Sequence, residues 1–203
     1  ISFKKLQSYK SSYQGWLTNV CNALENIKIH SELNRLVYKL EDISIKDELT
    51  GLYNRRALHT LGQKYLDQCI KNHSNLMVFS ADMDNLKYIN DIYGHAGGDI
   101  ALKAVASAMM NASEDDEICI RLGGDEFSVI GVEYDKEKVI QFVNKFNDAI
   151  QRFNKELTYE FKISISYGWG ITKANENTTL EECLSVADKR MYLQKYEKKK
   201  RGL

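Results

Sequence analysis

The stretch Gly123-Gly124-Asp125-Glu126-Phe127 decides how the middle of this chain folds. It lies between two apolar-rich runs, 117–122 and 127–132, and paired glycines between two such runs are typical of a β-hairpin turn. Because glycine has no Cβ, the backbone can turn sharply and approach a ligand closely there. We therefore expect adjacent carboxylates at the tip of a hairpin, where they can bind a hard cation. A glycine-rich turn with solvated acids is the simpler alternative.

A second group of acids follows the strongly apolar run 75–84, which ends in Asp82 and Asp84. Such a run predicts a buried central strand whose C-terminal edge carries the acids. Either aspartate could instead cap a short helix predicted over 85–92. The two acidic positions and the hairpin tip are candidates for one site.

The rest of the pattern alternates between helices and strands. Periodicity predicts helices at about 55–72, 97–111, 135–154 and 179–200, and strands at 75–83, 117–132 (the hairpin) and 159–169. The last strand rests on the alternation of Phe161, Ile163 and Ile165 with polar residues. The fold class is therefore α/β, with a mixed, mainly antiparallel sheet flanked by helices.

Residues 1–46 form a separate predicted segment, and 47–203 form the α/β domain. Apolar residues recur in the segment at spacings of three and four, which predicts a helical seam that packs against a partner. The seam comprises Tyr9, Tyr13, Trp16, Val20, Ala23 and Ile27, then Ile29, Leu33, Leu36, Leu40 and Ile43. The phase slips between Ile27 and Ile29, so we expect two helices or one with a register break. A signalling coiled coil between two protomers and a helix pair that folds back both fit.

Composition excludes several classes of protein. The 28 basic and 28 acidic residues balance, so no overall basic field points to nucleic acid. No apolar run approaches the ~18 residues that would span a membrane, and we expect no membrane contact by this part of the protein. The four cysteines are too widely spaced for a zinc motif and predict buried free thiols in a reducing cytoplasm. Because the chain starts at Ile1 without Met, we expect it to be part of a longer protein.

Four segments carry a resemblance to a known family. They read DxLTGLxNRR at 47–56, DxDxxKxINDxxGHxxGD at 82–99, RxGGDEF at 121–127 and ADxxMYxxK at 187–195. In order and spacing, the chain resembles the GGDEF-domain diguanylate cyclases, which condense two GTP molecules into cyclic di-GMP. The resemblance implies the palm-like fold shared with class III nucleotide cyclases.

The resemblance also implies a metal site. Asp82 and Asp125 would bind Mg²⁺ or Mn²⁺, two ions per GTP site, with help from the backbone carbonyl of Met83. Glu126 would support the second ion, and Asp125 would also assist deprotonation of the attacking hydroxyl. Lys87 would contact the triphosphate and stabilise the transition state.

Further positions are implied for substrate binding. Asn90 and Asp99 would read the guanine edge, where a carboxylate can accept hydrogen bonds from N1–H and N2–H₂. Without the resemblance, Asp99 could be a helix N-cap and Asn90 an exposed helix residue. The backbone amides of Gly123 and Gly124 would approach the nucleotide, and Lys195 would bind phosphate.

Two departures from the family pattern are visible. After Lys195 the family usually has a glycine and an arginine, whereas this chain has Lys198 and Lys199. Lys199 keeps the positive charge for substrate binding but loses the bidentate fork of arginine, although 198–201 could also be a solvated helix end. Many relatives carry an inhibitory Arg-x-x-Asp pair, and Glu114 and Glu117 stand in its place here. We expect no product inhibition through that site.

These observations predict a Mg²⁺-dependent diguanylate cyclase that is active as a homodimer through its cyclase domains and N-terminal helices. Its substrate would be GTP, and it would be the output domain of a larger bacterial signalling protein, at a cytoplasmic location. A catalytically silent domain that binds GTP as a regulatory module is the alternative. A mononucleotide cyclase or a polymerase palm is disfavoured by Asn90, Asp99 and the complete hairpin motif.

Overall fold

The computed structural model describes residues 16, 19–33, 45–114 and 117–201, in two compact units, Ile1–Ser44 and Ile45–Leu203. In the first unit, residues 19–33 form a helix that runs without interruption through Ile27 and Ile29. The change of seam phase therefore falls inside one continuous helix. Leu24 and Leu33 on this helix are exposed. Five of the seam positions lie outside the described residues: Tyr9, Tyr13, Leu36, Leu40 and Ile43.

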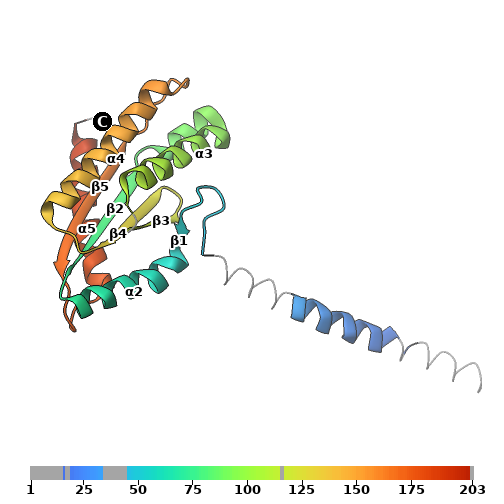
Figure 1. Ribbon diagram of the computed structural model, residues 1–203. Helices are drawn as coiled ribbons and strands as arrows, with labels where there is room; N and C mark the ends of the chain where they lie inside the picture. Colours follow the sequence, from blue (N-terminus) through green and yellow to red (C-terminus); the bar gives the residue numbers. More distant parts are fainter. Residues whose placement is uncertain (1–15, 17–18, 34–44, 115–116, 202–203) are drawn as a thin grey trace, which may run out of the picture. The chain divides into compact units, whose positions relative to one another are not determined.

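The second unit is built on a five-stranded sheet in the order β1-β3-β4-β2-β5 (Figure 1). Its elements are β1 (Tyr53–Asn54), α2 (Arg55–Asn72), β2 (Asn75–Met83), α3 (Leu86–Ala112), β3 (Glu117–Gly123), β4 (Glu126–Val132), α4 (Lys136–Glu156), β5 (Ile165–Lys173) and α5 (Leu180–Lys200). Only β1 and β3 pair in parallel, and the other neighbours are antiparallel. The predicted fold class is confirmed.

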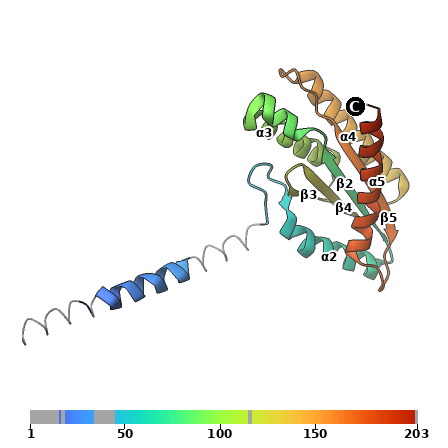
Figure 2. The same ribbon diagram turned by 180° about the vertical axis from the view of Figure 1, so that it is seen from behind.

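Helices cover both faces of the sheet, because successive side chains on the central strand β2 point to opposite sides (Figures 1 and 2). Met77 and Phe79 pack against α3 and α4, where Phe79 lies edge-on to Phe142, with ring centroids 5.1 Å apart. Leu76 and Val78 belong to a second cluster with residues of α2 and α5. Burial on both faces explains why the strand is apolar along nearly its whole length.

Two predicted elements differ from the structure. The last strand is β5, Ile165–Lys173, rather than 159–169. Phe161 and Ile163 are buried as predicted, but the Asn154 side chain bonds both the N–H and the carbonyl of Ile163. Alternating burial arises there from a side chain of α4 and not from strand pairing. The helices predicted at 85–92 and 97–111 are one element, α3, with a kink at Gly94 (φ 70°, ψ 171°).

Within the described ranges, no helix combines the length and the apolar content that a bilayer crossing would need. All four cysteines are free, but only three of them are buried; Cys21 is exposed.

Candidate active site

The C-terminal end of β2 and the tip of the β3–β4 hairpin meet at the same end of the sheet. The Met83 N–H donates a 2.9 Å hydrogen bond to the Asp125 carbonyl, and Asp82 pairs in register with Glu126. Gly124 at the tip has φ +56°, in the left-handed region that favours glycine. The structure therefore brings Asp82 and Asp125 together, as the sequence predicts.

Two arginines that sequence analysis left without a role hold this hairpin in place. The Arg121 guanidinium donates to the Gly124 carbonyl at 2.8 Å and pairs with Asp47 at 3.1 Å. The Arg55 side chain donates to the Leu122 carbonyl at 2.8 Å, and its Nη2 lies 3.4 Å from Glu126 Oε2. Both arginines belong to the motifs quoted above, and this was the feature of the sequence that could have identified them.

Asp82 is only 7% exposed and forms a 2.6 Å ion pair with Lys195 from α5. Burial raises the pKa of the Asp82 carboxyl, and the negative charges of Asp125 and Asp84 add to that effect. The Lys195 ammonium opposes these effects but does not cancel them. Asp82 therefore lies where additional positive charge would be stabilising.

Asp84 has a different environment. Its carboxylate accepts hydrogen bonds of 2.7 Å from Ser164 Oγ, Ser166 Oγ and Lys198 Nζ. Burial acts to raise the pKa of Asp84, but these three hydrogen bonds together lower it. The alternative in which an aspartate caps the next helix is wrong, since the N-cap residue of α3 is Asn85, with no side-chain cap bond.

The oxygen atoms at this edge fit a hard divalent cation. The carboxylates of Asp82 and Asp125 and the backbone carbonyl of Met83 are donors of the type that Mg²⁺ and Mn²⁺ prefer. The raised pKa of Asp82 is consistent with a carboxylate that lacks a full counter-charge. Among the described residues, no three Asp, Glu, His or Cys side chains cluster as metal ligands. Phosphate oxygens or water would have to complete such a coordination shell.

The residues predicted to read guanine lie together on α3. A Cβ on Gly98 would overlap Asn90 Oδ1, so Gly98 leaves the space that the Asn90 side chain occupies. Asp99, which is half-buried, follows directly and lies inside α3 rather than at an N-cap. Lys87 and Lys199 are exposed. The alternative of Asn90 as a simply exposed helix residue does not hold.

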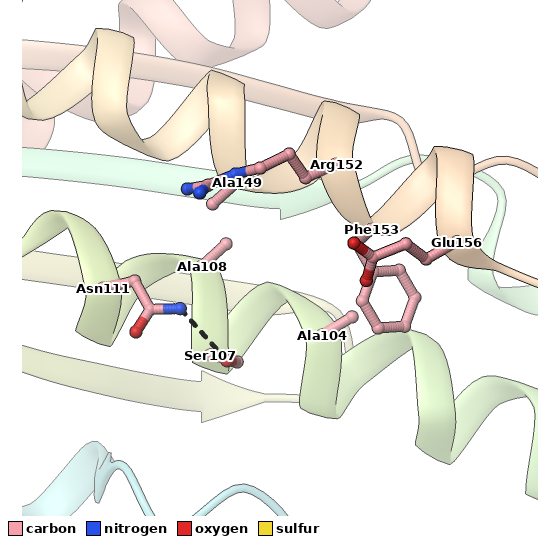
Figure 3. Close-up of a pocket in the computed structure, with 8 residues that line it drawn as sticks. All are labelled: Ala104, Ser107, Ala108, Asn111, Ala149, Arg152, Phe153 and Glu156. Carbon is pink, nitrogen blue, oxygen red and sulfur yellow. Dashed lines mark hydrogen bonds between the residues drawn. The ribbon is translucent and has the colours of Figure 1, made fainter.

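A cavity of about 450 Å³ lies elsewhere, between α3 and α4 (Figure 3). Three alanines, Ala104, Ala108 and Ala149, line it together with polar side chains such as Arg152 and Glu156. None of the motif acids lines this cavity. The acids of the candidate site instead lie where β2 ends and the β3–β4 hairpin turns.

The mixed sheet, the acidic hairpin tip and the lysine on the last helix define a palm-like α/β domain of the nucleotide-cyclase type. The family model "Diguanylate cyclase, GGDEF domain" matches residues 44–201. The chain therefore belongs to the GGDEF-domain diguanylate cyclase family, and its curated relatives are named diguanylate cyclases.

Individual relatives agree. The chain is 31% identical over 187 residues to the probable diguanylate cyclase DgcJ of Escherichia coli K12, covering 92% of this chain and 36% of that protein. It is 27% identical to the diguanylate cyclase DosC of the same organism, over 73% of this chain and 32% of DosC. It thus spans about a third of the length of these relatives.

Solved structures agree on the fold. SiaD of Pseudomonas aeruginosa, in complex with its activator SiaC, aligns with a TM-score of 0.70 at 22% identity, covering 96% of this chain and 75% of that one. The coiled coil and GGDEF domain of DgcB from Caulobacter crescentus, in complex with c-di-GMP, aligns with a TM-score of 0.69 at 19% identity, covering 87% and 94%.

Proposed function

We propose that this chain is a diguanylate cyclase that condenses two GTP molecules into cyclic di-GMP and releases two pyrophosphates. The observation that carries the proposal is the meeting of buried Asp82 with the hairpin tip at Asp125, joined by the hydrogen bond from Met83 N–H. Family membership supplies the reaction class. Two relatives that this chain covers in part are named diguanylate cyclases, which supports the same activity.

Each 3′-hydroxyl would attack the α-phosphorus of the other nucleotide, and the bond to pyrophosphate would break. The residues to hold Mg²⁺ or Mn²⁺, two ions per site, are Asp82, Asp125, Glu126 and the carbonyl of Met83. Bound metal would supply neutralisation of the charge that develops on the phosphoryl oxygens.

The remaining roles fall on side chains and backbone that surround the acids. Lys87, Lys195 and Lys199 would bind the phosphates, and Asn90 and Asp99 would read guanine. The backbone amides at Gly123 and Gly124 would lie close to the nucleotide because no Cβ intervenes. Asp125 would assist deprotonation of the hydroxyl.

Catalysis would require two domains, because each domain binds one GTP and the reaction joins two. The domains would face each other as a homodimer, and the N-terminal segment would help to pair them. Exposed Trp16, Ile27 and Ile29 are apolar residues that such pairing would bury. The chain would then act as the output domain of a larger signalling protein.

The test is incubation with GTP and Mg²⁺ over a range of protein concentrations, with products separated by chromatography and identified by mass. We expect cyclic di-GMP, formed at a rate that rises faster than linearly with protein concentration. Asp125→Asn should abolish the product, whereas Asp148→Asn, at an exposed position of α4, should not.

A silent GTP-binding module is the second candidate. The observation that favours it is the Lys195 ammonium, which lies on Asp82 where a cation would be needed. GTP that binds without conversion at every protein concentration would establish this alternative and overturn the cyclase proposal.

A further inference from the structure

β5 is an edge strand of the sheet, since among the strands that the structure describes it pairs only with β2. An edge strand leaves the backbone groups of alternate residues unpaired on its outer side. In β5 these groups include those of Ile165, Tyr167 and Trp169, each two residues from the next.

Three side chains of α5 bond these outer groups in sequence. Arg190 donates to the Trp169 carbonyl, Gln194 Oε1 accepts from the Tyr167 N–H at 2.6 Å, and Lys198 Nζ donates to the Ile165 carbonyl at 2.6 Å. We name Arg190, Gln194 and Lys198 the edge ladder.

The spacing of the edge ladder matches the strand. Its residues are four apart on a helix, a rise of about 6 Å, and their partners are two apart on a strand, about 6.6 Å. The helix and the strand run in opposite directions, so three successive bonds form without distortion of either element. One residue of slippage would turn the helix by about 100° and break all three bonds.

Two glycines on β5 let the helix lie close enough for these bonds. A Cβ at Gly168 would overlap the backbone of Ala187 and Met191, and one at Gly170 would lie 2.9 Å from Val186. The helix therefore rests directly on the strand backbone, and Figure 2 shows α5 alongside β5.

Lys195 lies between two members of the edge ladder, Gln194 and Lys198. Its ammonium reaches Asp82 at 2.6 Å, while Lys198 Nζ also donates to Asp84 at 2.7 Å. The direction of the Lys195 side chain therefore depends on the rotation and register of α5, which the edge ladder fixes. Lys198 is the residue that stands where the family usually has glycine.

We propose that Arg190, Gln194 and Lys198 are positioning residues that fix α5 on the edge of the sheet and hold Lys195 at the acidic site. Lys198 contributes most, because it bonds both the strand edge and Asp84. The consequence for GTP binding rests on the proposed function, whereas the placement of Lys195 does not.

The experiment measures two properties of Lys198→Met. One is the rate at which an amine-reactive reagent labels Lys195 in the nucleotide-free protein, mapped by mass spectrometry. The other is the Kd for GTP in the presence of Ca²⁺. We expect labelling to accelerate about threefold as the ion pair loosens, and the Kd to rise about tenfold as a charged contact to phosphate is lost.

Matched variants separate positioning from general destabilisation. Lys189→Met removes an exposed lysine of the same helix and should leave Lys195 labelling unchanged. Lys198→Arg keeps a cationic donor and should restore most of the native labelling rate. Should Lys198→Met fail to fold, Gln194→Leu replaces it, with Gln194→Glu as the variant that keeps the acceptor.

Equal labelling of Lys195 in the native protein, Lys198→Met and Gln194→Leu would overturn the proposal, whatever the cyclase activity. If Lys195 is labelled faster in the variants than in the native protein, but the native protein makes no cyclic di-GMP, the positioning role is supported and the proposed function is removed. The two failures are therefore distinguishable.

Discussion

Asp82 lies on β2 and Asp84 lies directly after the end of this strand, yet their environments shift the pKa values of the two carboxyls in opposite directions. Both side chains are 11% exposed, and each pairs with a lysine of α5, at 2.6 Å and 2.7 Å. The pKa of Asp82 is raised, and that of Asp84 is lowered. Since the two side chains are equally buried, the direction of each pKa shift is decided by the neighbouring groups and not by burial.

The decisive neighbours are hydroxyl donors for one acid and carboxylates for the other. Asp84 accepts from Ser164 and Ser166 in addition to Lys198, so its negative charge is fully solvated by the protein. Asp82 faces Asp125 and pairs with the Lys195 ammonium. Asp84 is therefore suited to a structural role, and Asp82 is suited to binding a cation that arrives with the substrate.

The largest effect is expected from Asp82→Asn. Removal of a metal-binding carboxylate should lower the cyclase rate by about 10³-fold, which corresponds to roughly 4 kcal/mol of lost transition-state stabilisation. The melting temperature should stay within about 2 °C of the native value, because lost repulsion from Asp125 offsets the lost pair with Lys195. Calorimetry and product quantification measure both. A large fall in stability would contradict the assignment of Asp82 to function.

Asp84→Asn is expected to lower the stability of the fold more than the cyclase rate. The variant loses charge-assisted hydrogen bonds and should destabilise the fold by about 2 kcal/mol, which lowers the melting temperature by roughly 5 °C. Below that temperature, the cyclase rate should fall by less than about tenfold. Asp148→Asn on the exposed face of α4 is the control. An Asp84→Asn protein of native stability but no activity would show that both aspartates are catalytic.

The sequence predicted the positions of these two acids but not the difference between their environments. The apolar run and the acids at its end predicted where Asp82 and Asp84 lie, because strand burial and hairpin turns depend on local pattern. Which acid is satisfied depends on Ser164, Ser166 and Lys198, which are 80 to 114 residues away along the chain. No local pattern encodes such partners.

The same reason explains the misplaced last strand. Phe161 and Ile163 alternate in burial like strand residues, but the amide of Asn154 takes the place of a partner strand. The edge ladder on β5 was also out of reach, since it needs the register of two elements rather than the pattern of one.

A third acid, Asp47, extends the comparison to the pH dependence of stability. Burial acts to raise the pKa of Asp47, but hydrogen bonds from Thr50 and Arg121 lower it below the ordinary value for an aspartate. A carboxyl with a lowered folded pKa stabilises the fold above its unfolded pKa, and this contribution is lost as pH falls through the folded pKa. We expect Asp47→Asn to melt below the native protein at pH 7, and the gap to shrink below about pH 4. A gap that stays constant with pH would show that the charge of Asp47 does not matter.

The smallest effect concerns a second pair of acids, Glu114 and Glu117. Glu117 accepts from the Glu114 N–H and the Tyr134 hydroxyl, and Glu114 pairs with Lys145 at 2.8 Å. Both carboxylates have partners within the protein, although the Glu114 side chain is 63% exposed, and neither can bind a phosphate as an arginine does. Titration of cyclic di-GMP against the initial rate should therefore show no non-competitive inhibition. The double variant Glu114→Arg with Glu117→Asp restores the family's pair and should introduce such inhibition. Potent non-competitive inhibition of the native protein would show that another surface binds the product.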